Sequence, residues 1–347
     1  MAVPAQAKVV ENYIGSYTSP PFWAGAAIDV SGLESSRFTE LMREEVYLHE
    51  DAAFNLRISR DGMLMLQVRS LTPVVRGESV PPEPIQDTAA WWGKYLDHVN
   101  TLHLLLDSAV LSKLNLALLS LTEVTWRDAL IIRFEDGYLK GGPFLPDSSA
   151  ESHQLLRYAS YCFRGDPSND SRIFSRRILP IEVFDLLKDN FAAAIRHPFL
   201  IQSLASVARS LSQYKVGNYS TSLLLSWFVI EAVINQEWDR FIDSSNRDLE
   251  NGVKRINAER RKHLSSGPDY PISVVSNLLE LADVLPSSDF MRIDQVRRYR
   301  NNIVHSKAGF VCGSEHCKMA IQLALDLCTK DSFKIQPNFF YSLIGTR

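Results

Sequence analysis

The sequence of 347 residues lacks the features that mark secreted and membrane proteins. Its four cysteines (Cys162, Cys312, Cys317 and Cys328) are too few and too scattered for a secreted disulfide framework. The start, MAVPAQAKVVENY, has no charged segment followed by an apolar run, so we expect no secretion signal. The longest apolar runs, such as LLLSWFVIEAVI, fall short of the roughly 18 to 20 residues of a membrane helix. We therefore predict a cytoplasmic protein with no membrane partner.

The sequence also lacks a strong charge of either sign and the common catalytic motifs. Lys and Arg number 37 against 40 Asp and Glu, so any site for a polyanion must be local. No Gly-rich phosphate loop, G-x-S-x-G elbow or H-E-x-x-H helix is present, which leaves ATPases, serine hydrolases and metalloproteases without support. CGSEHC (312–317) lacks the second ligand pair of a zinc site, so we expect neither a metal nor a cofactor.

Strand and helix patterns are mixed in the first half of the chain. FNLRISRDGMLMLQVRS (54–70) alternates apolar and polar residues around Asp61-Gly62, which predicts a β-hairpin. A helical pattern follows the loop at 81–87, and LNLALLSLTEV and ALIIRFEDGYL are typical of two further strands. The first half therefore predicts an α+β domain over 1–175, with a polar linker at 164–175.

Beyond residue 180 the strand signals stop and seven segments carry helical spacing. They are PIEVFDLLKDNFAAAI, PFLIQSLASVARSLSQY, NYSTSLLLSWFVIEAVINQEWDRFI, RDLENGVKRINAERRKHL, PISVVSNLLELADVL, SSDFMRIDQVRRYRNNIVH and EHCKMAIQLALDLC. We predict an all-α domain over 180–330 and a tail over 331–347. Glu231 falls in the apolar run at 223–234, where a buried carboxylate would need a partner such as an Arg from another helix.

The segment VRRYRNNIVHSK (296–307) places an Arg, two Asn and a His on one short helix. Phe290, Ile293, Val296, Tyr299 and Ile303 form its apolar stripe. Asn301 and His305 are four residues apart and share a face. Arg300 and His305 are about 140° apart on a regular helix, so they converge only if the helix bends or the Arg side chain reaches across.

RNA cleavage gives a chemical reason for this set of side chains. The 2′-hydroxyl of RNA is its own nucleophile, so cleavage without a metal needs a base, an acid and positive charge beside the phosphate. His suits the proton transfers, and Arg can bind phosphate oxygens bidentately. One His per chain is short of the two proton-transfer roles, and a twofold homodimer would supply the second.

Arg300 to His305, R-N-N-I-V-H, resembles the R-x(4–6)-H signature of HEPN-superfamily ribonucleases, with Asn301 at the polar position after the Arg. The resemblance covers roughly residues 185–330. It implies an all-α fold, a catalytic set of Arg300, Asn301 and His305, and a composite site in a homodimer. It further implies a metal-independent endoribonuclease that cleaves RNA, of the kind found among toxins with an antitoxin or regulatory partner and among abortive-infection (anti-phage) effectors.

Several neighbouring residues are expected to assist this site. We assign a supporting role to Glu231, Arg297 and Asn302. Residues 251–307 contain ten Lys and Arg against six Asp and Glu, a basic segment in an acidic chain that suits phosphate attraction. The expected RNA-binding residues there are Arg298, Lys307, Arg260, Arg261 and Lys262.

A structural interpretation of the same residues remains open. Arg300 could pair with Glu231 or Asp294, Asn301 could cap a helix, and His305 could end one before Gly309, where the helix dipole favours a cation. The chain would then be a non-catalytic HEPN-like helical module that binds a protein or a nucleotide.

Overall fold

The computed structural model describes residues 9–28, 35–71, 75–76, 88–135, 138–140, 176–249, 253–265, 270–305, 309–330 and 333–340. The chain divides into two compact units. Unit 1 comprises Met1–Ala208 and Ile335–Arg347, and unit 2 comprises Arg209–Lys334. This division falls inside a helix, α6 (Pro198–Lys215), and differs from the boundary near residue 180 that the sequence predicts.

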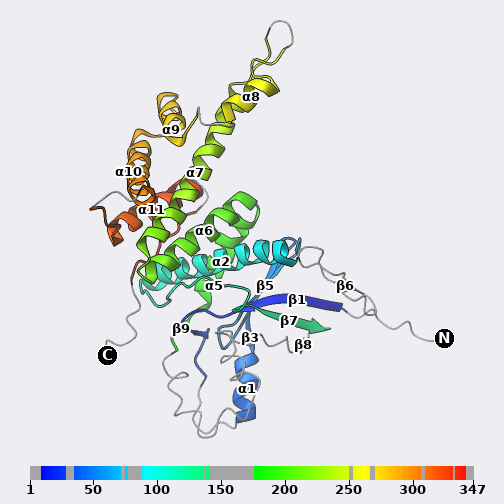
Figure 1. The fold of residues 1–347 in the computed structure, drawn as a ribbon. Helices are drawn as coiled ribbons and strands as arrows, with labels where there is room; N and C mark the ends of the chain where they lie inside the picture. The colour runs from blue at the N-terminus through cyan, green and yellow to red at the C-terminus, as the bar shows by residue number, and fades with distance from the viewer. Residues whose placement is uncertain are drawn as a thin grey trace, which may run out of the picture. The chain divides into compact units, whose positions relative to one another are not determined.

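Unit 1 has the α+β composition expected from its sequence (Figure 1). Its elements before α6 are β1 (Val9–Ser16), β2 (Trp23–Ala24), α1 (Ser35–Arg43), β3 (Glu45–Glu50), β4 (Phe54–Ser59), β5 (Leu64–Val68), β6 (Val75–Arg76), α2 (Thr88–Leu114), β7 (Leu130–Glu135), β8 (Tyr138–Lys140), β9 (Ile178–Leu179) and α5 (Ile181–Ile195). The main sheet is antiparallel, in the order β3-β4-β5-β1-β7-β8, with β6 also paired to β1. Strands β2 and β9 form a separate parallel pair.

The predicted hairpin at 54–70 is confirmed as β4 and β5. The two strands pair antiparallel, with Leu56 opposite Leu66. Gly62 in the connecting turn has φ +83°, a left-handed conformation that glycine adopts without a steric penalty. A Cβ atom at this position would lie 2.6 Å from the backbone oxygen of Phe22, so the turn also needs glycine for space.

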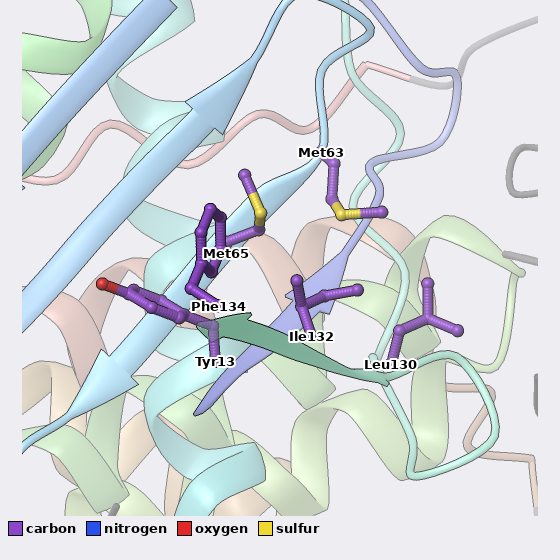
Figure 2. Close-up of a cluster of buried hydrophobic side chains, with 6 residues drawn as sticks. All are labelled: Tyr13, Met63, Met65, Leu130, Ile132 and Phe134. Atoms are coloured by element: carbon purple, nitrogen blue, oxygen red, sulfur yellow. The ribbon is translucent and has the colours of Figure 1, made fainter. Parts of the chain in front are cut away.

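One face of the sheet carries a cluster of buried side chains, shown in Figure 2. Strand β7 alternates buried and less buried residues, as expected for a strand with one face in a core. Its inward residues meet the neighbouring strand β1, where Tyr13 pairs with Ile132 in register. The cluster consists of Tyr13, Met63, Met65, Leu130, Ile132 and Phe134.

Helices α2 and α5 pack in unit 1 together with the sheet. Tyr95 of α2 donates a hydrogen bond from its hydroxyl to Leu66 O (3.0 Å) and accepts one from Val68 N (3.1 Å). The ring of Phe191 on α5 contacts that of Phe54 on β4, with centroids 4.9 Å apart. The sequence assigns α5 to the all-α domain, whereas its aromatic contacts place it with unit 1.

An ion network spans three strands of the sheet. Arg57 on β4 forms ion pairs with Glu11 (3.5 Å), Glu45 (2.8 Å) and Glu50 (3.0 Å). Its Nε also donates to the hydroxyl of Tyr13 at 2.9 Å. Burial opposes the charge, but Tyr13 and Glu45 outweigh it and raise the pKa of Arg57 above its ordinary value. Arg57 is therefore the cation that the three carboxylates share, and Glu11 also lies 4.0 Å from Arg69.

Two histidines of α2 have polar contacts within unit 1. His103 is buried, and its Nε2 lies 2.9 Å from Ser16 Oγ on β1. Burial disfavours the imidazolium ion and lowers the pKa of His103 to about 4, although Asp128 acts in the opposite direction. His98 places Nδ1 2.8 Å from Lys94 O, one turn earlier on the helix.

The predicted strand at LNLALLSLTEV (114–124) is wrong. The chain after α2 forms no strand there: Ser120 N donates to Ser19 O, and other peptide groups bond to side chains. The Asn100 amide accepts from Val124 N (2.8 Å) and donates to Val124 O (2.9 Å). The Asn338 amide donates to Leu119 O at 3.0 Å. Two Asn side chains thus take the place of a β ladder.

Residues 335–340 belong to unit 1 and do not form the separate tail predicted for 331–347. Ile335 and Asn338 are buried. The Asn338 amide donates to Asp107 Oδ1 at 3.1 Å, and Gln336 N donates to Ser108 Oγ at 2.9 Å. The last described residues are therefore bonded to α2.

Unit 2 is helical in the residues described, apart from an isolated bridge between Asp248 and Lys254. A buried hydroxyl cluster links its first two helices, since Ser210 Oγ lies 2.8 Å from Ser226 Oγ and donates to Ser222 O at 2.7 Å. Besides the end of α6, its helices are α7 (Tyr219–Ser244), α8 (Ala258–Ser265), α9 (Ile272–Leu281), α10 (Ser287–Val304) and α11 (Ser314–Thr329).

The helix predicted over RDLENGVKRINAERRKHL is shorter than expected. Only α8 is helical among its described residues. Asn246 holds the preceding segment by accepting from Ile256 N (2.9 Å) and donating to Ile256 O (3.0 Å). Asn257 Oδ1 then accepts from Arg260 N at 2.8 Å, the bond of a helix N-cap. In the part of the chain that the structure describes, no helix combines the length and apolar character needed to cross a membrane.

Candidate functional site

Helix α10 carries the candidate site on unit 2. Its predicted apolar stripe is confirmed at Ile293 and Val296, which are fully buried. Tyr299 and Ile303 continue the stripe as half-buried residues. The stripe faces the core and so fixes the rotation of α10 about its axis. Arg300, the residue after Tyr299, is half-buried.

Asn301 contacts both of the other predicted catalytic residues. Its Oδ1 accepts a hydrogen bond from Arg300 Nη1 at 3.1 Å. Its backbone oxygen accepts one from the backbone N–H of His305 at 2.9 Å. Asn301 therefore links the guanidinium to the turn that carries the imidazole.

His305 is the C-cap of α10 and not a member of its last turn. Its φ of −91° and ψ of 12° depart from helical values, and its side chain is exposed. The bond from His305 N to Asn301 O keeps its backbone N–H in the helical pattern, so the separation of about 140° from Arg300 expected on a regular helix still applies at the backbone. The imidazole is open to solvent, and the guanidinium beside Asn301 is half-buried.

The ion pairs that would make Arg300 a structural strut are absent from the described residues. Asp294 pairs instead with Arg297 (2.6 Å) and Arg298 (2.7 Å). Burial would raise the pKa of Asp294, but these two guanidinium groups hold it below its ordinary value. Glu231, expected to be buried, is half-buried, and no ion pair joins it to Arg300 in the described part of the chain. Neither carboxylate neutralises Arg300.

The other expected RNA-binding and supporting residues differ in their exposure and in whether they form ion pairs. Arg261 on α8 pairs with Asp243 of α7. Arg260 donates to Arg255 O at 3.1 Å, and both Arg260 and Lys262 are exposed. Asn302 is half-buried on α10, and Lys307 lies outside the described residues. Arg261, Arg297 and Arg298 thus share their charge with a carboxylate, which weakens their attraction for a phosphate.

Tyr299, which precedes Arg300, contacts two rings that the sequence did not indicate. Tyr299 contacts His316 on α11 with ring centroids 4.4 Å apart, and Phe310 with centroids 6.1 Å apart. The Tyr299 hydroxyl accepts from Gln295 Nε2 at 2.6 Å. The rings join the end of α10 to the start of α11. Sequence spacing could not reveal this, because Tyr299 and His316 lie on different helices.

The short segment CGSEHC begins α11. His316 Nδ1 accepts from Gly313 N at 3.0 Å, and Cys317 is buried, as are Ala320 and Ala324 on the same helix. Among the residues that the structure describes, no group of three His, Cys, Asp or Glu side chains is arranged to hold a metal ion.

The chain was compared with models of known protein families, with curated protein sequences and with solved structures, and none of the three comparisons gives a match.

Proposed function

We propose that this protein is a metal-independent endoribonuclease of the HEPN type, acting as a toxin or anti-phage effector. The observation that carries the proposal is the link through Asn301, which bonds Arg300 on one side and the His305 turn on the other. An exposed imidazole and a guanidinium without an acidic partner among the described residues are what a phosphate-directed site requires.

The chemistry follows from the residue types. One imidazole takes the proton of the 2′-hydroxyl while its oxygen bonds to phosphorus. The bond from phosphorus to the 5′-oxygen breaks, and a second imidazole gives that oxygen a proton. Arg300 stabilises the charge on the phosphorane oxygens. The products are a 2′,3′-cyclic phosphate and a 5′-hydroxyl.

Each chain supplies a single His305 to this scheme, so the second proton-transfer group comes from a second copy. A twofold homodimer would place two α10 ends against one RNA backbone. Cleavage per chain should then rise with protein concentration through the range in which the dimer forms, and light scattering should report dimer mass in the same range.

Purified protein incubated with RNA in EDTA tests the proposal. We expect 2′,3′-cyclic phosphate ends, and His305→Ala and Arg300→Ala should lower the rate at least about a hundredfold. Arg196→Ala and His197→Ala are matched controls, because both side chains are exposed on unit 1 and each change removes the same residue type. Melting temperatures should be unchanged in all four variants, as expected for exposed or half-buried residues with few contacts.

Intact RNA after incubation with the parent protein would count against the proposal. If the parent binds RNA or a nucleotide without cleaving, the chain is the non-catalytic HEPN-like module instead. Expression of the parent and of His305→Ala in the same host separates a toxin from a binding module, because growth should slow only with the parent. An antitoxin or regulatory partner would be sought as a protein that relieves this growth defect.

A further inference from the structure

The start of α11 holds two cysteine thiols in contact. Cys312 Sγ and Cys317 Sγ are 3.9 Å apart. The chain is extended at the N-cap Gly313 (φ −109°, ψ 176°) and becomes helical at Ser314, which brings residue 312 back over the first turn. Cys312 is half-buried and Cys317 is fully buried.

The two thiols differ in their surroundings. Cys317 donates from Sγ to Tyr219 O, the first residue of α7, at 3.0 Å. The neighbouring Cys312 and burial together raise the pKa of Cys317. The contact with Cys317 lowers the pKa of Cys312, although burial opposes this shift. Cys312 is therefore the more acidic thiol and also the more accessible one, as an attacking thiolate must be.

Metal binding does not account for this pair of cysteines. The nearby His316 uses Nδ1 to accept from Gly313 N, and its ring packs on Tyr299. The described residues offer the two thiols no third ligand in a metal-holding group. A pair of thiols in contact, one accessible and one buried, has instead the arrangement of an oxidisable cysteine with its resolving partner.

We propose that Cys312 and Cys317 are a modification site at which a peroxide forms a reversible disulfide. The Cys312 thiolate attacks one oxygen of hydrogen peroxide, the O–O bond breaks, and the sulfenic acid and one water result once a proton is taken up. Cys317 sulfur then attacks Cys312 sulfur and displaces hydroxide, which takes the Cys317 proton and leaves as water. Two thiols and one peroxide give one disulfide and two waters.

The structure can accommodate this bond with a small movement. The distance between the two sulfurs must fall from 3.9 Å to about 2 Å. Cys312 lies in a non-helical segment, where its side chain can rotate toward α11. The disulfide removes the hydrogen bond from Cys317 to Tyr219 O. It also ties the segment that carries Phe310, whose ring contacts Tyr299, to the first turn of α11.

Mass spectrometry of the oxidised full-length protein tests the inference directly. Trypsin cleaves after Lys307 and Lys318, so both cysteines fall in one peptide, AGFVCGSEHCK. The protein is treated with hydrogen peroxide, its remaining thiols are alkylated, and it is digested. We expect this peptide without an alkyl group and lighter than the dithiol peptide by two hydrogen atoms. Dithiothreitol before alkylation should restore two alkylation sites.

Single variants separate the roles of the two thiols. Cys317→Ser should leave Cys312 as a sulfenic acid that a 1,3-diketone reagent traps. Cys312→Ser should leave Cys317 unmodified. Cys328→Ser is the control and should leave the cross-link unchanged, because Cys328 is on the far part of α11, where burial raises the pKa of its thiol to about 12.

Three results would overturn the inference: a doubly alkylated peptide after peroxide, oxidation of Cys312 to a sulfinic acid without a cross-link, or a disulfide joining either residue to Cys162 or Cys328. None of these readouts depends on RNA cleavage. The disulfide proposal can therefore be refuted without affecting the nuclease proposal, and the nuclease proposal can be refuted without affecting the disulfide proposal.

Discussion

Asn301 Oδ1 accepts a hydrogen bond from Arg300 Nη1 at 3.1 Å, and the same residue accepts the His305 backbone N–H at its carbonyl. The first bond belongs to the side chain and can be removed by mutation, whereas the second remains. Asn301 is therefore a positioning residue in the proposed mechanism, and its effect should be separable from that of Arg300 itself.

We predict that Asn301→Ala lowers kcat for RNA cleavage about tenfold with little change in KM, since the loss corresponds to one hydrogen bond. Asn301→Asp keeps an acceptor for Arg300 and should retain more activity than Asn301→Ala. Steady-state kinetics on a short oligonucleotide provides the measurement. Asn235→Ala, an exposed amide on α7, serves as the control. Equal losses for the Ala and Asp variants would exclude a positioning role.

The ion network around Arg57 gives a prediction on stability. Arg57→Met keeps the apolar stem but leaves Glu11, Glu45 and Glu50 without their shared cation. The free energy of unfolding should fall by about 3 kcal/mol in urea denaturation. Arg37→Met breaks an exposed pair with Glu40 and should cost less than about 1 kcal/mol. Similar costs for the two variants would contradict the network.

Burial of His103 predicts a loss of stability in mild acid. Its pKa falls from the ordinary 6.5 to about 4 in the folded protein. Between these values the unfolded chain binds a proton that the folded protein does not, so stability decreases as the pH falls from 6.5 toward 4. From pH 7 to pH 5 the loss assigned to this residue is about 2 kcal/mol.

Urea denaturation at both pH values, compared between the parent and His103→Asn, isolates this contribution. The variant should be less stable at pH 7 but should lose about 2 kcal/mol less than the parent on acidification. His197→Asn, a change at an exposed histidine, should follow the parent. A parallel pH dependence in the parent and His103→Asn would refute the assignment.

Two glycines with the same backbone conformation offer a matched pair. Gly62 and Gly217 have φ values of +83° and +80°. A Cβ at Gly62 would meet Phe22 O at 2.6 Å, whereas a Cβ at Gly217 has nothing within 4 Å. Gly217→Ala should therefore cost about 1 kcal/mol of backbone strain alone. Gly62→Ala should cost about 3 kcal/mol or more in the same denaturation assay.

The spacing of apolar residues predicted those helices and strands that bury one apolar face. The β4–β5 hairpin, α2 and the helices of unit 2 other than α8 follow their apolar spacing. The predictions failed at 114–124 and, among the described residues, at 247–249 and 253–257, because Asn100, Asn246 and Asn257 bond backbone groups that periodicity assigns to a strand or a helix. A side-chain amide that substitutes for backbone pairing leaves no periodic signal.

For the candidate site, the sequence indicated the helix and the order of its residues but not their partners. The bond between the Arg300 and Asn301 side chains was not predicted, because neighbouring residues on a helix do not face each other. The position of His305 as a C-cap depends on where α10 ends. The pairing of Asp294 with Arg297 and Arg298 was one of several equivalent choices along the helix. The contacts of Tyr299 and of Cys317 with other segments required the tertiary structure.

The division of the chain makes unit 2 a nested segment, since unit 1 resumes at Ile335 after unit 2 is complete. A stop codon placed just after α11 would leave α10, with Arg300 and His305, in the chain. It would remove Asn338, and with it the hydrogen bonds that its amide donates to Asp107 and Leu119 within unit 1. Excising the helical segment alone requires two cuts and one splice. Unit 2 alone is one continuous stretch that two cuts release, whereas expression of unit 1 alone begins with a rejoined chain.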